Sequence, residues 1–318
     1  MTGGRRPSDA PRSPVRALLL YNPAATTTTA RVRDAIAQLL ASELKLEVAP
    51  TKRRDHASFL AAGAADEGID VVVALGGDGT VNEIVQGVAH SRVLLAVLPG
   101  GSTNVYARAL GLPNDPRAAT QEVVDLLRHG QHRRVPLASA NERYFCFAAG
   151  LGFDAEVVRR VEQRPRVKRV VRQGAFVISG IGPLLTASDP RRAEIRVTAD
   201  GTTHEGYRSV VCGAAQPYTY LGPWPVRLCP DGSLDRGLAV TALTRLGLPG
   251  LLRLARVALS AGDVRRLPTV DAWSDLTEAH LLSDRPLPLQ LDGDYVGELT
   301  EVWLRRVPAA LSVVAPRS

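Results

Sequence analysis

Lysine is nearly absent from this chain of 318 residues, although its net charge is +7. Among 39 Lys and Arg residues only three are lysine, namely Lys45, Lys52 and Lys168. A Walker A loop needs a glycine directly before its lysine, and here those positions hold leucine, threonine and valine. The chain therefore has no P-loop, and any binding of nucleotide phosphates must use another arrangement.

Cysteines and long apolar runs are also scarce. Three widely spaced cysteines argue against a secreted disulfide framework. The longest uncharged stretch, 173–188, is interrupted by glycine and proline and falls short of the ~20 residues that span a membrane. The first sixteen residues carry four arginines and three prolines without a following apolar run, so we expect a disordered basic arm, not a signal peptide. These absences predict a cytoplasmic protein whose contact with a membrane is peripheral.

The first part of the chain alternates apolar runs with helical patterns. The runs 17–21, 69–75 and 93–98 are continuously apolar, and 44–48 alternates like a half-exposed strand. Helical spacing follows each run, as in residues 30–42. Continuously apolar strands separated by helices predict a parallel sheet that is covered on both faces, with ligands at the carboxyl ends of its strands.

After residue 134 the pattern changes to strands bounded by Gly, Pro and Asp turns. The expected strands are 144–149, 194–198, 207–212, 238–243, 287–291 and 302–304. One helix, about 248–260, interrupts them. We therefore predict an α/β fold in two parts: a Rossmann-like domain like that of NAD kinases, and a mostly antiparallel domain resembling a β-sandwich.

Two glycine-rich loops follow neighbouring predicted strands and open helices. The first runs from Gly76 to Glu83 and reads G-G-D-G-T-V-N-E, and the second, 99–104, reads P-G-G-S-T-N. Backbone N–H groups and the helix dipole at such positions favour a phosphate. The first loop fails the dinucleotide fingerprint, because Asn82 stands where its third glycine belongs. From spacing alone, an ordinary strand-to-helix turn remains an alternative.

These residues resemble the signatures of the diacylglycerol kinase catalytic-domain family, which includes bacterial lipid kinases, sphingosine kinases and ceramide kinases. The G-G-D-G-T turn followed by N-E resembles its first motif, and the second loop resembles P-L-G-T-x-N-D-F-A-R, with Ser102 and Val105 as departures. Further matching segments are 150–155 (G-L-G-F-D-A), 230–235 (P-D-G-S-L-D) and 292–294 (D-G-D). The ordered set extends over nearly the whole chain, whereas a single G-G-D-G is shared with NAD kinases and phosphofructokinases.

The resemblance implies an active site in a cleft between two domains. We expect a basic arm at 1–15, an ATP-binding α/β domain at 16–134, a β-rich substrate domain at 135–302, and a C-terminal segment at 303–318 that returns to the first domain. By the same resemblance, ATP is held by the end of the first strand, the next strand end and both glycine loops. The residues nominated for ATP are Asn22, Thr51, Gly76, Gly77, Asp78, Gly79, Thr80, Val81, Asn82, Glu83, Ser102 and Asn104. The family's N-P-x-S-G is incomplete after Asn22, and the threonines 26–29 are alternative donors.

A magnesium site and a general base are also implied. In bacterial members Mg²⁺ is coordinated by the aspartate of a D-G-x-L-D segment and by nearby carbonyls, which here nominates Asp231, Leu228 and Ser233. Asp294 stands where the family has the glutamate of an I-D-G-E hairpin, its proposed base. Asp78 is the second catalytic candidate, placed to orient a metal or the acceptor. Without the resemblance, Asp231 and Asp294 are ordinary residues of Asp-Gly turns.

The leading hypothesis is thus an ATP- and Mg²⁺-dependent kinase that phosphorylates the hydroxyl of diacylglycerol or a related lipid. One alternative is a kinase of the NAD kinase type that acts on a soluble acceptor. Another is a non-catalytic protein that binds lipid or nucleotide, because positions 105, 230 and 294 depart from the family pattern. The sequence leaves open which lipid is the acceptor, and it leaves the oligomeric state open, a homodimer included.

A basic stretch at 159–172 carries seven cations against one glutamate and precedes the uncharged segment 173–188. A basic patch beside an apolar surface favours docking on an anionic membrane, here the inner surface, and a solvated basic face before a buried helix is the alternative. We expect no nucleic-acid partner, because aromatic residues make up only 5% of the chain and no stacking module is present.

Overall fold

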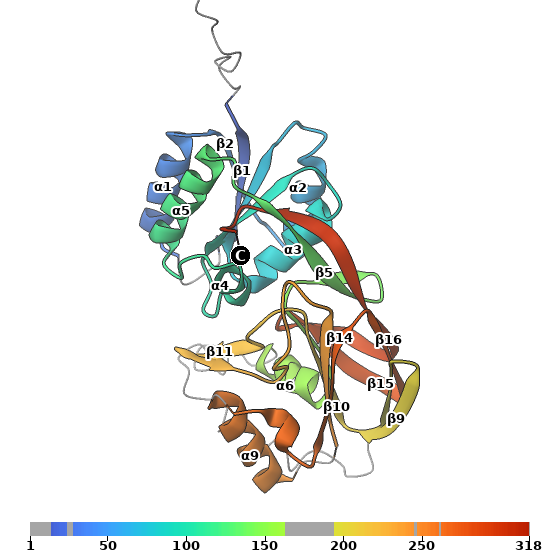
Figure 1. The fold of residues 1–318 in the computed structure, drawn as a ribbon. Helices are drawn as coiled ribbons and strands as arrows, with labels where there is room; N and C mark the ends of the chain where they lie inside the picture. Colours follow the sequence, from blue (N-terminus) through green and yellow to red (C-terminus); the bar gives the residue numbers. More distant parts are fainter. Residues whose placement is uncertain (1–13, 24–27, 163–193, 245–246, 261, 318) are drawn as a thin grey trace, which may run out of the picture.

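The protein forms two lobes that are joined by long strands (Figure 1). The computed structural model describes residues 14–23, 28–162, 194–244, 247–260 and 262–317. Its buried side chains divide mainly between one cluster in an α/β lobe and another in a β-rich lobe. No helix in the described part of the chain is long and apolar enough to span a bilayer.

In the α/β lobe, strands and helices alternate along the chain. They are β1 (Arg16–Tyr21), α1 (Ala30–Ala41), β2 (Lys45–Pro50), α2 (His56–Gly63), β3 (Val71–Gly76), α3 (Asp78–Val88), β4 (Leu94–Pro99), α4 (Val105–Ala109) and α5 (Pro116–Arg128). The four strands pair in parallel in the order β4-β3-β1-β2. Every residue of β3 is buried, which explains its unbroken apolar sequence. The carboxyl ends of all four strands therefore meet at one edge of this sheet, above α4 in Figure 1.

The β-rich lobe is built mainly from antiparallel strands. Its elements are β6 (Arg143–Phe145), β7 (Ala148–Gly152), α6 (Phe153–Glu162), β8 (Ile195–Ala199), β9 (Thr202–Tyr207), β10 (Ser209–Gly213), β11 (Thr219–Leu221), β12 (Trp224–Val226), β13 (Leu238–Leu243), α9 (Leu248–Leu259), the 3₁₀ turn η1 (Val264–Arg266) and β14 (Val270–Leu276). Strands β14, β13, β10, β7 and the end of β15 pair side by side, all antiparallel. A separate hairpin, β11–β12, projects from this lobe (Figure 1).

Two strands, β5 (Arg133–Ala140) and β16 (Asp294–Val313), connect the lobes (Figure 1). β15 (Glu278–Leu291) and β16 form a long hairpin, and β5 pairs antiparallel with β16. At its end, β16 turns into the α/β sheet, where Ser312 and Val313 pair in parallel with β4. One continuous sheet thus runs through both lobes, and the tight turn between β15 and β16 is held at a fixed place relative to α3.

The predicted fold class is confirmed: an α/β lobe is followed by a mostly antiparallel β lobe. The expected strand at 144–149 is wrong in detail, because β6 ends at Phe145 and β7 begins at Ala148. This break turns three backbone N–H groups toward a buried carboxylate, as described below. The predicted basic arm and most of the stretches 159–172 and 173–188 lie outside the described residues, and the proposed domain boundaries stay a prediction.

Candidate active site

The two glycine loops pack directly against each other at the carboxyl ends of β3 and β4. The Gly100 N–H donates to the Gly76 carbonyl at 2.8 Å. A Cβ on Gly101 would lie 2.5 Å from the Cα of Gly77, and one on Gly100 would lie 2.9 Å from the backbone nitrogen of Gly76. Only glycine allows backbones this close, so the sequence of both loops follows from their contact. The first turns of α3 and α4 consequently open side by side.

Asp78 ties the two loops together. One of its carboxylate oxygens accepts from the Thr103 hydroxyl at 3.0 Å and from the Val105 N–H at 3.1 Å, and the other accepts from the Tyr106 N–H at 3.0 Å. These donors lie at the start of α4, so Asp78 supplies the side-chain cap that α4 lacks at its own Asn104. Enclosure of the carboxylate raises the pKa of Asp78.

The residues nominated for nucleotide binding divide into two groups. Gly77, Gly79 and Thr80 are half-buried and Ser102 is exposed, so they border the open edge of the sheet. Asn22 follows β1, and Thr51 follows β2 and donates its N–H to the Tyr21 carbonyl at 2.8 Å. These positions share one edge of the sheet, as the sequence predicts.

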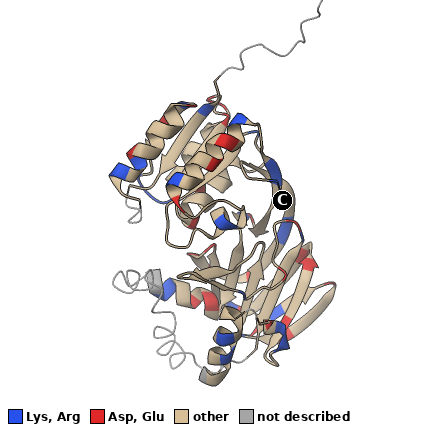
Figure 2. Cartoon of the chain, turned by 60° about the vertical axis from the view of Figure 1, so that its left-hand side comes forward, with Lys and Arg blue, Asp and Glu red and all other residues tan. Residues whose placement is uncertain are grey.

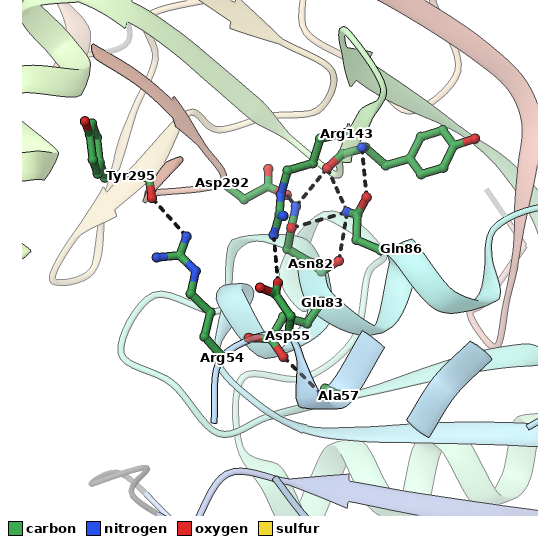
Figure 3. Close-up of polar contacts among 10 residues, drawn as sticks. Arg54, Asp55, Ala57, Asn82, Glu83, Gln86, Arg143, Asp292 and Tyr295 are labelled. Atoms are coloured by element: carbon green, nitrogen blue, oxygen red, sulfur yellow. Dashed lines mark hydrogen bonds and ion pairs between the residues drawn. The ribbon is translucent and has the colours of Figure 1, made fainter. Parts of the chain in front are cut away.

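Other nominated side chains face the interior of the lobe. Val81 is in the core, and Glu83 accepts from the Ala57 N–H at 3.1 Å, which caps α2 (Figure 3). The Asn104 carboxamide bonds to both the N–H and the carbonyl of Gly101, at 2.7 and 3.0 Å. Asn82 donates to Asp292 and to the Tyr144 carbonyl. Through these contacts the polar side chains of Asn82, Glu83 and Asn104 stabilise the glycine loops and the neighbouring helices.

Asp292 is the anchor of the β15–β16 turn, and sequence analysis predicted no functional role for it. Its carboxylate accepts from the N–H groups of Cys146, Phe147 and Ala148 at 2.7, 2.9 and 3.1 Å, and from the Asn82 amide at 2.8 Å. Figure 3 shows Asn82 on α3 reaching toward it. Burial raises the pKa of Asp292 to about 6. The carboxylate thereby joins α3, the β6–β7 break and the hairpin at one point.

The anchored turn brings Asp294 to the first turn of α3. A Cβ built on Gly79 would lie 2.5 Å from one carboxylate oxygen of Asp294 and 3.5 Å from the other. Asp294 is half-buried. Arg54, which follows β2, donates to the carbonyl of the next residue, Tyr295, at 2.9 Å (Figure 3). The structure thus brings together the glycine turn and the residue nominated as base, which are more than two hundred positions apart in the sequence.

A polar cluster next to this turn was missed by sequence reasoning. The Tyr218 hydroxyl lies 2.7 Å from both carboxylate oxygens of Asp154, and the Gln290 amide donates to Asp154 at 3.0 Å. The Gln290 oxygen accepts from the Gly293 N–H at 2.8 Å, inside the turn itself. Enclosure raises the pKa of Asp154. The sequence signal for this cluster was the G-L-G-F-D-A segment, which places Asp154 in the first turn of α6, directly after β7.

The residues nominated for Mg²⁺ do not fit a bound cation in this structure. Asp231 forms an ion pair with Arg265 at 2.7 Å, and the same guanidinium pairs with Asp263 at 2.8 Å. The Leu228 carbonyl accepts from the Thr241 hydroxyl, and the Ser233 carbonyl accepts from Arg306. No group of three or more His, Cys, Asp or Glu side chains suited to a metal occurs among the described residues. A guanidinium therefore neutralises the carboxylate that the divalent cation was expected to use.

The described part of the basic stretch is also paired. Arg160 lies 2.6 Å from Glu156, and Arg159 pairs with both Glu156 and Glu298, at 2.7 and 3.2 Å.

Arg108, on α4, lies over the Tyr220 ring, 3.2 Å from its centroid. This cation–π contact links the second glycine loop to the β11–β12 hairpin of the other lobe.

Comparisons with known proteins agree with this arrangement. Residues 16–140 match the family model described as the diacylglycerol kinase catalytic domain. The chain is 28% identical over 306 residues to a diacylglycerol kinase of Staphylococcus aureus (strain JH9), which covers 95% of this chain and 92% of the relative, and the match to that of strain Newman is the same.

Solved structures support the fold. The crystal structure of a diacylglycerol kinase from Bacillus anthracis (strain Sterne) superposes with a TM-score of 0.71 at 18% identity, over 96% of this chain and 98% of that one. A second structure from the same organism gives a TM-score of 0.75 at 20% identity, over 96% and 99% of the two chains. Residues 16–140 are thus similar to the diacylglycerol kinase catalytic domain, and the chain is similar over 95% of its length to proteins named diacylglycerol kinase.

Proposed function

We propose that this protein is a lipid kinase that transfers the γ-phosphoryl group of ATP to the hydroxyl of diacylglycerol or a closely related lipid. The match to the catalytic domain, and relatives named diacylglycerol kinase over 95% of the chain, support the acceptor class. The observation that carries the proposal is the approach of the Asp294 carboxylate to Gly79, at the point where two glycine loops open.

In the proposed reaction the lipid hydroxyl oxygen attacks the γ-phosphorus, and the bond from that phosphorus to the β–γ bridging oxygen breaks. ADP leaves, and the hydroxyl proton passes to the Asp294 carboxylate. A base in this role must come within hydrogen-bond reach of the hydroxyl, which the hairpin turn favours by holding Asp294 beside the first turn of α3. Phosphoryl transfer otherwise depends on positioning and on neutralising charge.

The phosphates need positive partners, and no P-loop lysine is available. We propose that the N–H groups at the start of α3 and of the second loop bind them. When present, Mg²⁺ neutralises phosphate charge, and we propose that it enters with ATP, because Asp231 is already paired with Arg265. Asp78 and Asp292 act as positioning residues in this scheme, since each carboxylate is engaged by several protein donors.

The test is transfer of radiolabelled γ-phosphate from ATP to diacylglycerol, sphingoid bases, ceramide and NAD, each supplied separately. We expect product with diacylglycerol or a related glycerolipid and a loss of about 10²–10⁴-fold in turnover for Asp294→Asn, with folding unchanged. Asp294→Glu restores the carboxylate and is expected to recover part of the turnover.

Asp284→Asn is the matched control, because Asp284 is an exposed carboxylate on β15 outside the site. Full turnover in Asp294→Asn contradicts the assignment of the base. Transfer to NAD in place of lipid supports the soluble-acceptor alternative, and binding without any transfer supports a non-catalytic protein.

A further inference from the structure

Two large apolar side chains of the β-rich lobe lie exposed on neighbouring elements, β12 and α9. Trp224, at the start of β12, is 61% exposed, and Leu252, on α9, is 51% exposed. Among the described residues only Val48 and Phe59 are large hydrophobic side chains exposed in a comparable way, and both belong to the α/β lobe. Because β12 and α9 pack against each other, one partner can contact both side chains.

The two side chains belong to one packed unit. α9 lies against β12, and the Arg227 N–H, directly after β12, donates to the Ala258 carbonyl at 2.9 Å. Leu254 and Ala258 form the buried side of α9, against which Val226 packs. Leu252, Arg253 and Arg256 are exposed on the helix. We call Trp224, Leu252, Arg253 and Arg256 the docking face.

The charge around this face is net positive. The segments 216–231 and 247–267 contain five arginines and two acids, Asp231 and Asp263, which both pair with Arg265, at 2.7 and 2.8 Å. Figure 2 shows the blue segments of α9 at the end of the β-rich lobe. Arg253 and Arg256 are exposed on the same helix as Leu252, and basic with apolar side chains is the composition of helices that lie at an anionic lipid surface.

We propose that the docking face binds the surface of an anionic lipid bilayer, with Trp224 and Leu252 inserted at the level of the head groups and Arg253 and Arg256 bound to the lipid charges. A tryptophan placed at this depth keeps its ring in the apolar layer and its N–H in water. Each arginine close to such a surface contributes to binding. A second copy of the chain fits poorly, because two identical faces would bring arginines together.

The docking face is connected to the candidate active site through the hairpin that bears Trp224. Tyr220 of β11 stacks with Arg108 of α4, the helix that follows the second glycine loop, and Tyr218 bonds to Asp154 beside the β15–β16 turn. A bilayer at the docking face therefore contacts the same hairpin as the site. The connection between docking and catalysis rests on the proposed function, which identifies the lipid that is phosphorylated. The docking itself requires neither ATP nor acceptor.

The experiment is co-sedimentation of the full chain with phosphatidylcholine vesicles, with and without phosphatidylglycerol, in the absence of ATP and diacylglycerol. We expect wild-type protein to bind mainly the anionic vesicles, and salt to weaken binding. Arg253→Gln with Arg256→Gln should reduce partitioning roughly 30-fold, from about 1 kcal/mol per cation. Trp224→Ala with Leu252→Ser should reduce it several-fold, and the emission of Trp224 should shift to the blue on binding in wild type but not in Trp224→Phe.

Phe59→Ser with Arg117→Gln is the matched control, because both residues are exposed on the α/β lobe. An equal loss in this control, equal binding to neutral vesicles, or dimers that the docking-face variants abolish would each overturn the proposal. Turnover is measured in parallel with diacylglycerol in neutral detergent micelles. If the docking variants keep this turnover, their loss of vesicle binding is a failure of docking. It is then not a failure of the proposed kinase activity.

Discussion

Two Asp-Gly turns of the β-rich lobe hold their carboxylates in opposite ways. In the turn between β15 and β16, Asp292 is buried and accepts hydrogen bonds from neutral donors, three of them backbone N–H groups from the β6–β7 break. In the turn at 230–233, Asp231 is partly exposed and pairs with the guanidinium of Arg265. The first turn is held against α3 by Asn82, whereas the second is paired with a residue of its own lobe.

In the proposed reaction, this difference decides which turn presents the base. Neutral donors hold Asp292 without cancelling a charge elsewhere, so the turn is fixed while Asp294, two residues on, stays at the glycine loop. The ion pair at Asp231 uses the one carboxylate that this turn offers. An exposed ion pair of this kind contributes less than ~1 kcal/mol to stability, so it matters little for the fold. Its main consequence is that Arg265, and not a metal ion, is the cation at Asp231.

The largest expected effect comes from Asp292→Asn. An amide offers one acceptor oxygen where the carboxylate offers two, so at least one buried N–H loses its partner and the free energy of unfolding falls by about 1–3 kcal/mol. The turn then shifts at Asp294, and turnover falls roughly 100-fold. Chemical denaturation and the kinase assay measure the two losses, and Asp284→Asn serves as the control.

The same variant should also change how the free energy of unfolding depends on pH. Because the folded protein holds the pKa of Asp292 at about 6 against an ordinary 3.8, the folded state binds this proton more tightly than the unfolded state. The linked stability is fully present below about 3.8 and is lost as the pH rises through 6, a total of roughly 3 kcal/mol. Wild type should therefore gain stability relative to Asp292→Asn as the pH falls through this window. A stability difference that is constant with pH contradicts the raised pKa of Asp292.

The sequence predicted the parallel sheet and both glycine loops, because apolar runs and glycine pairs are local signals, and it nominated Asp294 by its resemblance to a family motif. It did not reveal the anchoring of the turn. The acceptor role of Asp292 depends on N–H groups about 145 positions away, which become available only because a strand expected to be continuous breaks after Phe145. Likewise, Arg265 lies 34 residues from Asp231, and nothing in the D-G-S-L-D segment indicates the pairing.

Asp78, like Asp292, is a carboxylate held by neutral donors. The variant Asp78→Asn tests whether it has a positioning role at the glycine loops. Loss of one acceptor oxygen should loosen the start of α4 and raise the KM for ATP about tenfold, near 1.4 kcal/mol, with kcat little changed. The exposed Asp66→Asn is the control. Steady-state kinetics across pH decide the matter: a large fall in kcat, with one limb of the pH profile removed and KM unchanged, would instead assign the proton transfer to Asp78.

The smallest expected effect tests the other turn. Arg265→Leu removes the guanidinium from Asp231 and Asp263, and the two carboxylates then repel each other unless a cation replaces it. Without nucleotide, millimolar Mg²⁺ or Ca²⁺ should raise the melting temperature of this variant by about 2–4 °C, which corresponds to roughly 1 kcal/mol of linked binding. Wild type and the exposed Arg266→Leu should respond equally weakly, because Arg265 already supplies the charge. The opposite result is a saturable stabilisation of wild type by Mg²⁺ that Asp231→Asn abolishes. In that case Mg²⁺ replaces Arg265 as the partner of Asp231, and the turn at 230–233 contributes a metal ligand.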